Sequence, residues 1–531
     1  MKNVSLLLSI LLIVIGSMRI VSTYNHLSQV YDEPFHMLRG MHWQTGHAYV
    51  HTEHPPLGPL VFAFRPRLYG VIYNDAGSKQ ADGNSILYCN GEYVRTLTLF
   101  RMGNMIFFWP ACFVLYAWAA SRNRPWTGVI AVAFFTFCPT VLAHSGLATT
   151  DMPITAMLLC TVVSLERSLA NPSIARWLIA GAVTGLVFVA KLSALLFVPV
   201  CFIALLCFSN HSYPSLSKRR VFVNGIVYML ALVAVVWSIY RFSIGPLGSI
   251  QIKEYSFEGF PVWINKLIVP APEFVAGIVW AKNKLDTGHG DYFFGKTAGG
   301  GSPLFFPTVL AIKTPLVMLI CCLISGITSV IHLRRNWYEW PTESLFISVL
   351  LLVSVIPSSV NIGVRHILPI YPFLSVLAAD GMLRLVRCVR GNLFCKMFAV
   401  IGICTLTSWL IKDSISSHPH YLSHFNELAF GKPELIVTNS DLDWGQGVFE
   451  LEKLCRERQI NPLQVQYFGT ADLQQHNLPS KPMPEDETYW LAISLTNLFR
   501  YSQFEKFRMT VPDAIVRGGS IRLYRVQKNE M

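Results

Sequence analysis

Apolar segments long enough to cross a bilayer recur along most of this 531-residue chain and limit its fold more than any other feature. A membrane-spanning helix needs roughly 20 mostly apolar residues. The sequence is 52% hydrophobic and only 14% charged, whereas soluble domains carry roughly a quarter charged residues. The sequence therefore predicts an all-α polytopic membrane bundle with about 11 transmembrane helices. The segments lie at residues 4–22, 103–120, 127–143, 153–166, 177–190, 193–208, 221–241, 304–331, 343–358, 366–383 and 395–412.

Basic residues set the expected orientation of this bundle. They fall on alternate connections between the apolar segments, and cytoplasmic loops of membrane proteins collect Lys and Arg. The net charge of +12 is then a matter of topology, and no nucleic-acid partner is expected. We interpret the first apolar run as an uncleaved span with its N-terminus inside. The basic connections contain Arg122 and Arg124, Arg167 and Arg176, Lys218 to Arg220, Arg334 and Arg335, and Arg384, Arg387, Arg390 and Lys396.

With this orientation, two long segments and the C-terminal part lie outside. The long segments are residues 23–101 and 242–303, and the chain after about residue 413 changes to a soluble composition. Residues 447–459 have helical periodicity, while 435–437, 465–468, 489–493 and 521–526 are typical of strands. We therefore expect a membrane domain at 1–412 and a small α/β extracytoplasmic domain at 413–531.

Acidic residues near the membrane boundary are the first candidates for chemistry. Asp32 and Glu33 follow the first span, where adjacent carboxylates are costly unless they serve a function. Glu53 and His54 precede two prolines that force an extended turn. Asp151 lies in a link between two short apolar segments and is expected to face a cavity. The alternative for Asp32 and Asp151 is that each caps the helix that follows it.

Cations occur in or beside apolar segments on the same predicted side. They are Lys191, Lys313 and Arg365, and His366 is adjacent to the last. Snorkelling of the charge to the interface is the ordinary explanation for one such residue. As a group, they suit a lipid phosphate through charge-assisted hydrogen bonds. Carboxylates that activate a nucleophile beside cations that hold a phosphate leaving group favour transfer of a group from a lipid phosphate.

The ordered set of motifs resembles the GT-C membrane glycosyltransferases, in the family 39-like branch of protein O-mannosyltransferases and aminoarabinose transferases. The resemblance rests on the acidic pair, the Glu-His-Pro-Pro turn, the link at Asp151, and the stretches around Lys191, Lys313 and Arg365. The stretch at 440–446 (Ser-Asp-Leu-Asp-Trp-Gly-Gln) resembles bacterial members with a soluble C-terminal domain.

This resemblance implies a polyprenyl-phosphate or dolichyl-phosphate sugar donor, inversion at the anomeric carbon, and Asp32 as the base. Asp32, Glu33 and Glu53 are then the catalytic candidates. The substrate-binding candidates are His54, Asp151, Lys191, Lys313, Arg365 and His366. Aminoarabinose transferases carry a Lys where this chain has His54. Some relatives bind a divalent metal near these carboxylates, and nothing in this sequence fixes one.

Other functions stay open at this point. The acceptor is a glycan, a lipid or a protein. The main alternative to an enzyme is a transporter or flippase for a glycolipid, although no inverted repeat is visible, as many transporters have. A third option is a non-catalytic relative that binds glycans. In the C-terminal part, Asp441, Asp443 and Trp444 either bind sugar or form a turn after a strand.

Overall fold

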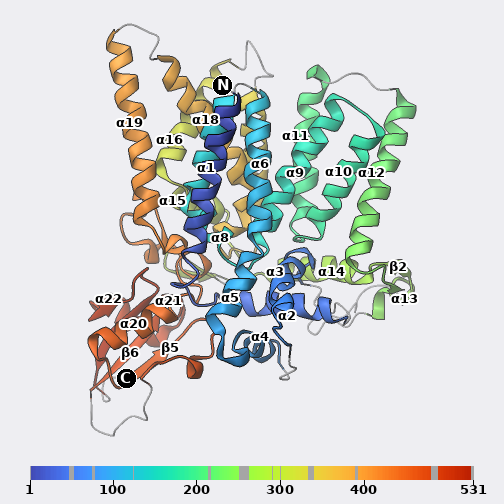
Figure 1. Ribbon diagram of the computed structural model, residues 1–531. Helices are drawn as coiled ribbons and strands as arrows, with labels where there is room; N and C mark the ends of the chain where they lie inside the picture. Colours follow the sequence, from blue (N-terminus) through green and yellow to red (C-terminus); the bar gives the residue numbers. More distant parts are fainter. Residues whose placement is uncertain are drawn as a thin grey trace.

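The protein is a bundle of apolar helices with short helices and a small α/β domain gathered at one end (Figure 1). The N-terminus lies at the opposite end of the bundle. The computed structural model describes residues 2–46, 53–73, 78–122, 125–212, 217–249, 262–289, 291–298, 300–332, 340–388, 393–479 and 488–527. The predicted polytopic helical fold is confirmed.

The bundle is built from the apolar segments that the sequence predicts. Within the described residues, six helices are long and apolar enough to cross a membrane, and two further pairs of helices are bent at a short break. Three shorter apolar helices complete the set. The helices are α1 (Lys2–Val21), α6 (Met105–Arg122), α7 (Pro125–Thr136), α8 (Pro139–Ser145), α9 (Asp151–Ala170), α10 (Ile174–Phe188), α11 (Ala194–Ser212), α12 (Lys218–Ile239), α15 (Phe305–Lys313), α16 (Leu316–His332), α17 (Trp340–Val355), α18 (Tyr371–Cys388) and α19 (Leu393–Ser416).

Proline accounts for the bends in both pairs. α7 and α8 meet at 70°, and Pro139 is the first residue of α8. α15 and α16 meet at 112° across Thr314 and Pro315. The residue before a proline is disfavoured in helical conformation, so a helix ends there. Each break leaves a helix end inside the bundle rather than at its surface.

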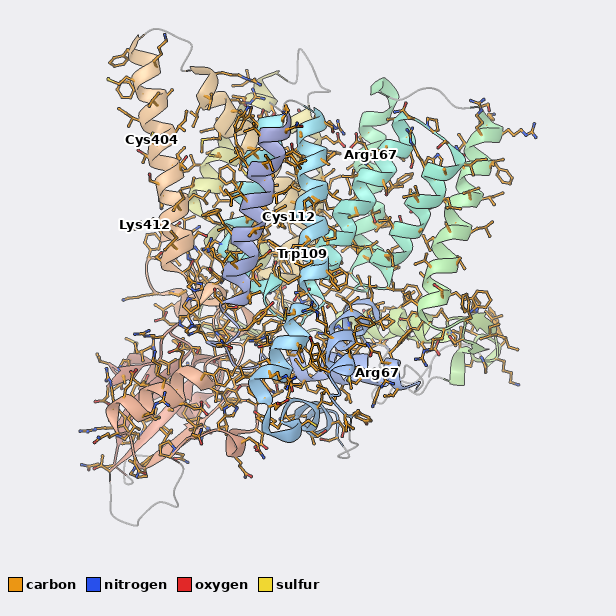
Figure 2. The ribbon with its side chains drawn as sticks, viewed as in Figure 1. Arg67, Trp109, Cys112, Arg167, Cys404 and Lys412 are labelled. Carbon is orange, nitrogen blue, oxygen red and sulfur yellow. The ribbon has the colours of Figure 1, made fainter. Side chains whose placement is uncertain are left out.

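The predicted basic connections gather at the end of the bundle where the N-terminus lies. Arg122 at the end of α6 forms ion pairs with Glu166 of α9 and with Glu343 of α17. Figure 2 places Arg167 at this end and Arg67 among the short helices at the other end. The same figure shows Trp109, Cys112, Cys404 and Lys412 along the bundle itself. Four of the predicted basic residues fall outside the described residues, namely Arg124, Arg334, Arg335 and Arg390.

Short elements cover the other end of the bundle. Two hairpins, β1 with β2 and β3 with β4, are antiparallel. α5 leads into α6 through Gly103 and Asn104. These elements are α2 (Glu33–Thr45), α3 (Leu57–Leu68), α4 (Lys79–Leu87), α5 (Tyr93–Met102), β1 (Ile244–Pro246), α13 (Val262–Asn265), β2 (Ile268–Pro270), α14 (Pro272–Thr287), β3 (Asp291–Phe293), β4 (Lys296–Ala298) and the 3₁₀ helix η3 (Val364–Ile370).

The C-terminal domain is a four-stranded sheet with helices beside it. The strand order is β5-β6-β8-β7, with β5 and β6 parallel and the other pairs antiparallel. This confirms the predicted α/β character. The elements are α20 (Val448–Arg458), β5 (Leu463–Gln466), β6 (Tyr489–Ser494), α21 (Leu495–Arg500), α22 (Glu505–Met509), β7 (Ala514–Ile515) and β8 (Ile521–Val526).

The predicted strand at 435–437 is wrong. A 3₁₀ turn, η6 (Pro433–Leu435), ends there, and Val437 forms only an isolated bridge with Phe293. Ile436 and Val437 are buried in the same hydrophobic cluster as the bundle helices. These apolar side chains therefore dock the segment onto the membrane domain instead of joining the sheet. The boundary predicted at 412/413 stays a prediction.

Candidate functional site

The site forms where the start of α2 meets η3. Asp32 precedes α2 but its side chain makes no capping hydrogen bond. Instead, Arg365 of η3 donates from Nη1 to Asp32 Oδ2 at 2.7 Å, across 333 residues of sequence. Both side chains retain some exposure, 10% for Arg365 and 21% for Asp32. The structure thus joins a predicted base directly to a predicted phosphate-binding cation.

Glu33 points the other way, into the core. Its two oxygens accept hydrogen bonds from Nε and Nη2 of Arg101, both at 2.8 Å, and both side chains have no exposed area. The backbone N–H groups of Val30 and Ala148 also donate to Glu33, each at 2.9 Å. A bidentate pair with all its hydrogen bonds made is typical of a structural role. Catalysis by Glu33 stays a prediction, and its surroundings favour positioning of the Asp32 segment.

Asp151 forms the second acid and cation pair. It is the first residue of α9, directly after the cap position at Thr150, and is 1% exposed. Lys191 donates from Nζ to Asp151 Oδ1 at 2.6 Å, and Thr149 donates from Oγ1 to Oδ2 at 3.0 Å. The prediction that Asp151 lies buried within the bundle end is consistent with this placement. Its ion pair leaves the Lys191 side chain 12% exposed.

Glu53 and His54 complete the cluster through α2. Arg39 donates from Nη2 to Glu53 Oε1 at 2.6 Å. The rings of His36 and His54 meet edge to face with centroids 4.9 Å apart. The turn is held by a hydrogen bond from the Leu57 N–H to the Val189 carbonyl at 2.9 Å, beside Lys191. The Pro-Pro turn therefore brings the second predicted acid to the same end of the bundle as Asp151.

The histidines of this cluster are neutral at physiological pH. Burial lowers the pKa of His54 well below its usual value, and the neighbouring Arg39 lowers it further. Burial also lowers the pKa of His36 to about 3; Arg39 and Arg365 add to this effect, while Asp32 and Asp151 oppose it. His54 is thus not a charged substitute for the Lys that aminoarabinose transferases carry at this position.

We expect the stability of the protein to fall as the pH drops from about 6.5 toward 3, in part through His36. The unfolded chain protonates His36 near 6.5 and the folded protein only near 3, so unfolding takes up a proton within this window. His36 alone contributes up to about 1.4 kcal/mol per pH unit there. Thermal midpoints at pH 7.5 and 5.0 should therefore differ less for His36→Gln than for wild type. His26→Gln, at a side chain that is 48% exposed, is the control. An unchanged difference in His36→Gln would contradict the prediction.

Lys313 and His366 lie near the site but with different partners. The Lys313 ammonium is 1% exposed and donates to the carbonyls of Leu422 at 2.6 Å and Asp441 at 2.8 Å. It also lies over the ring of Phe425, 4.1 Å from the centroid. These contacts fix the end of α15 to the chain after α19, and they give no support to phosphate binding by Lys313. His366 is partly buried and packs near Phe306. Its predicted role stays untested.

Sequence reasoning missed two residues of this cluster, Arg39 and Arg101, and it missed the contact that Trp444 makes with Arg365. Arg39 and Arg101 are the partners of Glu53 and Glu33. Trp444, from the chain after α19, lies under Arg365 with the guanidinium carbon 4.3 Å from the ring centroid. Trp444 is 1% exposed, so the predicted sugar stacking on its ring is not available in this structure. The basic charge of Arg39 and Arg101 in an apolar sequence was the available signal.

The carboxylates do not fit a divalent metal. No three His, Cys, Asp or Glu side chains among the described residues are grouped so that they could hold an ion. Asp32, Glu53 and Asp151 each accept a charge-assisted hydrogen bond from Arg or Lys. A metal ion would have to displace these cations from the carboxylates.

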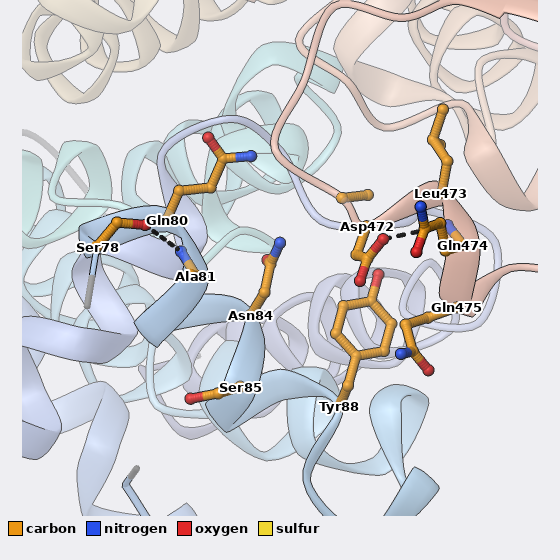
Figure 3. Close-up of a pocket in the computed structure, with 11 residues that line it drawn as sticks. Ser78, Gln80, Ala81, Asn84, Ser85, Tyr88, Asp472, Leu473, Gln474 and Gln475 are labelled. Carbon is orange, nitrogen blue, oxygen red and sulfur yellow. Dashed lines mark hydrogen bonds between the residues drawn. The ribbon is translucent and has the colours of Figure 1, made fainter. Parts of the chain in front are cut away.

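A polar cavity lies elsewhere, between α4 and residues 471–475 of the C-terminal domain (Figure 3). Its volume is about 690 Å³. Asn84 in its wall accepts a hydrogen bond from the side chain of Gln29 at 3.0 Å. Gln29 lies three residues before Asp32 in the sequence. Among the residues that the structure describes, the lining contains Gln80, Ser85, Tyr88, Asp472, Gln474 and Gln475 and no cation. This composition suits hydroxyl groups rather than a phosphate.

Part of the chain matches a known protein family. Residues 95–239 match the family described as dolichyl-phosphate-mannose-protein mannosyltransferase. This segment contains Asp151 and Lys191. No curated protein sequence matches the chain significantly.

Solved structures match over much more of the chain. ArnT from Cupriavidus metallidurans bound to undecaprenyl phosphate has a TM-score of 0.50 and 12% identity, over 97% of each chain. The apo state of that ArnT has a TM-score of 0.44 and 13% identity, again over 97% of each chain. AglB, the archaeal oligosaccharyltransferase of Archaeoglobus fulgidus, has a TM-score of 0.46 and 13% identity, over 80% of this chain and 58% of that one.

At such low identity the match to undecaprenyl-phosphate-bound ArnT establishes the fold, and the family match comes from the sequence itself. The two findings agree with the motifs along the chain. The chain therefore has an ArnT-like fold, and its residues 95–239 resemble the dolichyl-phosphate-mannose-protein mannosyltransferase family.

Proposed function

We propose that the protein transfers a sugar from a polyprenyl-phosphate or dolichyl-phosphate donor to an acceptor, with inversion at the anomeric carbon. The observation that carries this proposal is the ion pair between Asp32 and Arg365. It places a carboxylate that can take a proton beside a cation that can hold a phosphate. The solved ArnT structure with undecaprenyl phosphate supports the donor class.

In the proposed reaction, an acceptor hydroxyl attacks the anomeric carbon on the face opposite the lipid phosphate. The new bond joins the acceptor oxygen to this carbon, and the bond from the carbon to the phosphate oxygen breaks. Asp32 takes the hydroxyl proton, and the lipid phosphate leaves with its electron pair. A positioned general base contributes about 10²–10⁴-fold to the rate.

Cations of the cluster, Arg365 beside Asp32 and Lys191 beside Asp151, would hold the leaving phosphate. Arg365 can grip two phosphate oxygens with its planar guanidinium, whereas Lys191 acts as a point charge. Both side chains keep part of their surface exposed, at 10% and 12%. Lys313 is nearly fully buried and bound to carbonyl groups, so we assign it to the scaffold. Glu53 and Asp151 hold Arg39 and Lys191 in place.

We also propose that this end of the bundle faces the outside of a bacterial cytoplasmic membrane. The basic ends of α6 and α9 lie at the opposite end, and the positive-inside rule assigns such an end to the cytoplasm. A reporter fused to the C-terminus, active only outside the cytoplasm, should then be active. The acceptor, whether a glycan, a lipid or a protein, would approach from the outside.

The function is tested by the chemistry of the lipid-linked sugars. Membranes with the active protein should convert a polyprenyl-phosphate sugar into free polyprenyl phosphate and a glycosylated acceptor, detected by mass spectrometry. A transporter or flippase would move the donor without changing its mass. An intact donor pool that only changes sides of the membrane would therefore overturn the proposal.

Arg365 variants should lose donor affinity. A charge-assisted hydrogen bond contributes about 1.5–3 kcal/mol, so Arg365→Gln should raise the donor KM roughly 10- to 150-fold. Arg365→Lys keeps the charge but loses the bidentate hydrogen bonding, so its donor KM should lie between those of wild type and Arg365→Gln. Initial rates at varied donor concentration measure this. Arg384→Gln, at an ion pair with Asp380 on the same membrane segment, is the matched control. Equal donor KM values for Arg365→Gln and wild type would remove Arg365 from the phosphate site.

A further inference from the structure

Residues 440–446 form a loop, here called the bridging loop, between the chain after α19 and α20. Its acidic and aromatic side chains are deeply buried, with Asp441, Asp443 and Trp444 each 1% exposed. The loop belongs to the part of the chain predicted to be extracytoplasmic. It nevertheless lies between the two membrane-domain segments that carry Asp32 and Arg365.

One side of the bridging loop holds the segment of Arg365. Asp441 Oδ1 accepts a hydrogen bond from the Val364 N–H at 2.9 Å. Ser440 donates from Oγ to the Ile362 carbonyl. Trp444 presents its ring to Arg365, with the guanidinium carbon 4.3 Å from the centroid. The backbone just before Arg365 and the Arg365 guanidinium are therefore held by one loop.

The other side of the loop holds the segment of Asp32. The Tyr31 N–H donates to the Trp444 carbonyl at 2.9 Å, and the Ser28 N–H donates to the Gln446 carbonyl at 3.2 Å. Ser28 Oγ also donates to the Gly445 carbonyl at 3.1 Å. Trp444 thus contacts Arg365 through its ring and, through its backbone, Tyr31, the residue before Asp32.

The loop is anchored in turn to the C-terminal domain and to the bundle. Asp443 Oδ2 accepts from the Thr496 N–H at 3.0 Å, and Thr496 Oγ1 donates to the Asp443 carbonyl at 2.9 Å. Thr496 lies in α21. On the membrane side, the Lys313 ammonium donates to the Asp441 carbonyl at 2.8 Å. The C-terminal domain therefore reaches the site through this loop.

We infer that Trp444 is a positioning residue, which sets the orientation of Arg365 toward the donor phosphate. This inference rests on the proposed function of Arg365. A guanidinium stacked on a buried indole is held with its N–H groups in one plane, where they can donate to an anion. The bridging loop also sets the distance between Arg365 and Asp32, because it is hydrogen-bonded to the backbone beside each of them. The C-terminal domain is then part of the catalytic unit and not only an appended binding module.

The test is donor kinetics of Trp444→Leu in the full-length protein, with a polyprenyl-phosphate sugar as the probe. Loss of a buried cation–π contact should raise the donor KM about tenfold. Trp444→Phe keeps a ring and should recover most of the affinity. In an Arg365→Gln background, Trp444→Leu should raise the donor KM no further, because the two residues act as one unit. Trp490→Leu is the matched control, because Trp490 stacks with Arg525 inside the C-terminal domain.

The outcomes separate positioning from a purely structural role. A merely structural Trp444 would lower the fraction of active enzyme, and thus kcat, with an unchanged donor KM in both Trp444 variants; that result would overturn the inference. If Trp444→Leu does not fold, Trp444→Phe is used for the test. We then expect a donor KM between the values of wild type and Arg365→Gln. A wild-type donor KM in Trp444→Phe would contradict the inference. Absence of transfer by the wild-type protein would instead count against the proposed function.

Discussion

Asp32→Asn is expected to lower the rate of sugar transfer by about 10²–10⁴-fold, because an amide cannot take the acceptor proton. The change is nearly isosteric, and Asp32 retains 21% exposure, so the fold should be preserved. The loss should appear in kcat and persist at saturating donor and acceptor. Product formation by purified protein in proteoliposomes gives the measurement.

The matched control for this variant is Asp286→Asn. Asp286 is an exposed aspartate on α14, at the same end of the bundle. Its substitution should leave the rate unchanged. Wild-type turnover by Asp32→Asn would show that Asp32 is not the base. The remaining acids of the cluster, Glu53 and Asp151, would then be the candidates for this role.

Glu33→Gln is expected to destabilise the protein by about 3–5 kcal/mol, because it leaves the buried Arg101 guanidinium without a counter-charge. Both side chains have no exposed area, and Arg101 also donates to the carbonyls of Leu27 and Ser28. The variant should therefore loosen the segment that leads to Asp32. A large drop in the thermal midpoint in detergent or nanodiscs would show this.

An exposed ion pair at the start of α5, the helix that carries Arg101, provides the comparison for Glu33. Glu92 and Arg95 are each about half exposed, and Glu92→Gln should change the stability by less than about 1 kcal/mol. Replacement of both Glu33 and Arg101 by apolar residues should be less harmful than the two single changes added together. If Glu33→Gln melts like wild type but no longer transfers sugar, Glu33 is catalytic and the structural assignment is wrong.

The helical bundle could be predicted from the sequence because each membrane helix is a run of consecutive, mostly apolar residues. The long run at 304–331 was predicted as one span, whereas the structure bends it by 112° at Thr314 and Pro315. The strand predicted at 435–437 failed for a different reason. Its apolar residues pack on the bundle, and the choice between sheet and bundle depends on the tertiary structure.

Pairing within the site could not be predicted from the sequence. Asp32 and Arg365 lie 333 residues apart, and Glu33 and Arg101 lie 68 apart. Only the family resemblance singled out Asp32 of the two adjacent acids as the base. In the structure, Asp32 faces the Arg365 guanidinium at the partly exposed site, and Glu33 has its hydrogen bonds satisfied in the core. Only the fold assigns one cation to each acid, and so separates the candidate base from the scaffold.

The ion pair between Asp32 and Arg365 links the candidate base to the candidate donor site. While the pair is closed, the guanidinium occupies Oδ2 of Asp32 and keeps an acceptor hydroxyl away from this oxygen. A donor phosphate would compete with Asp32 for the same guanidinium and would uncover the oxygen on binding. Arrival of the donor and exposure of the base would then be a single event, and an acceptor that arrives first would find this oxygen occupied.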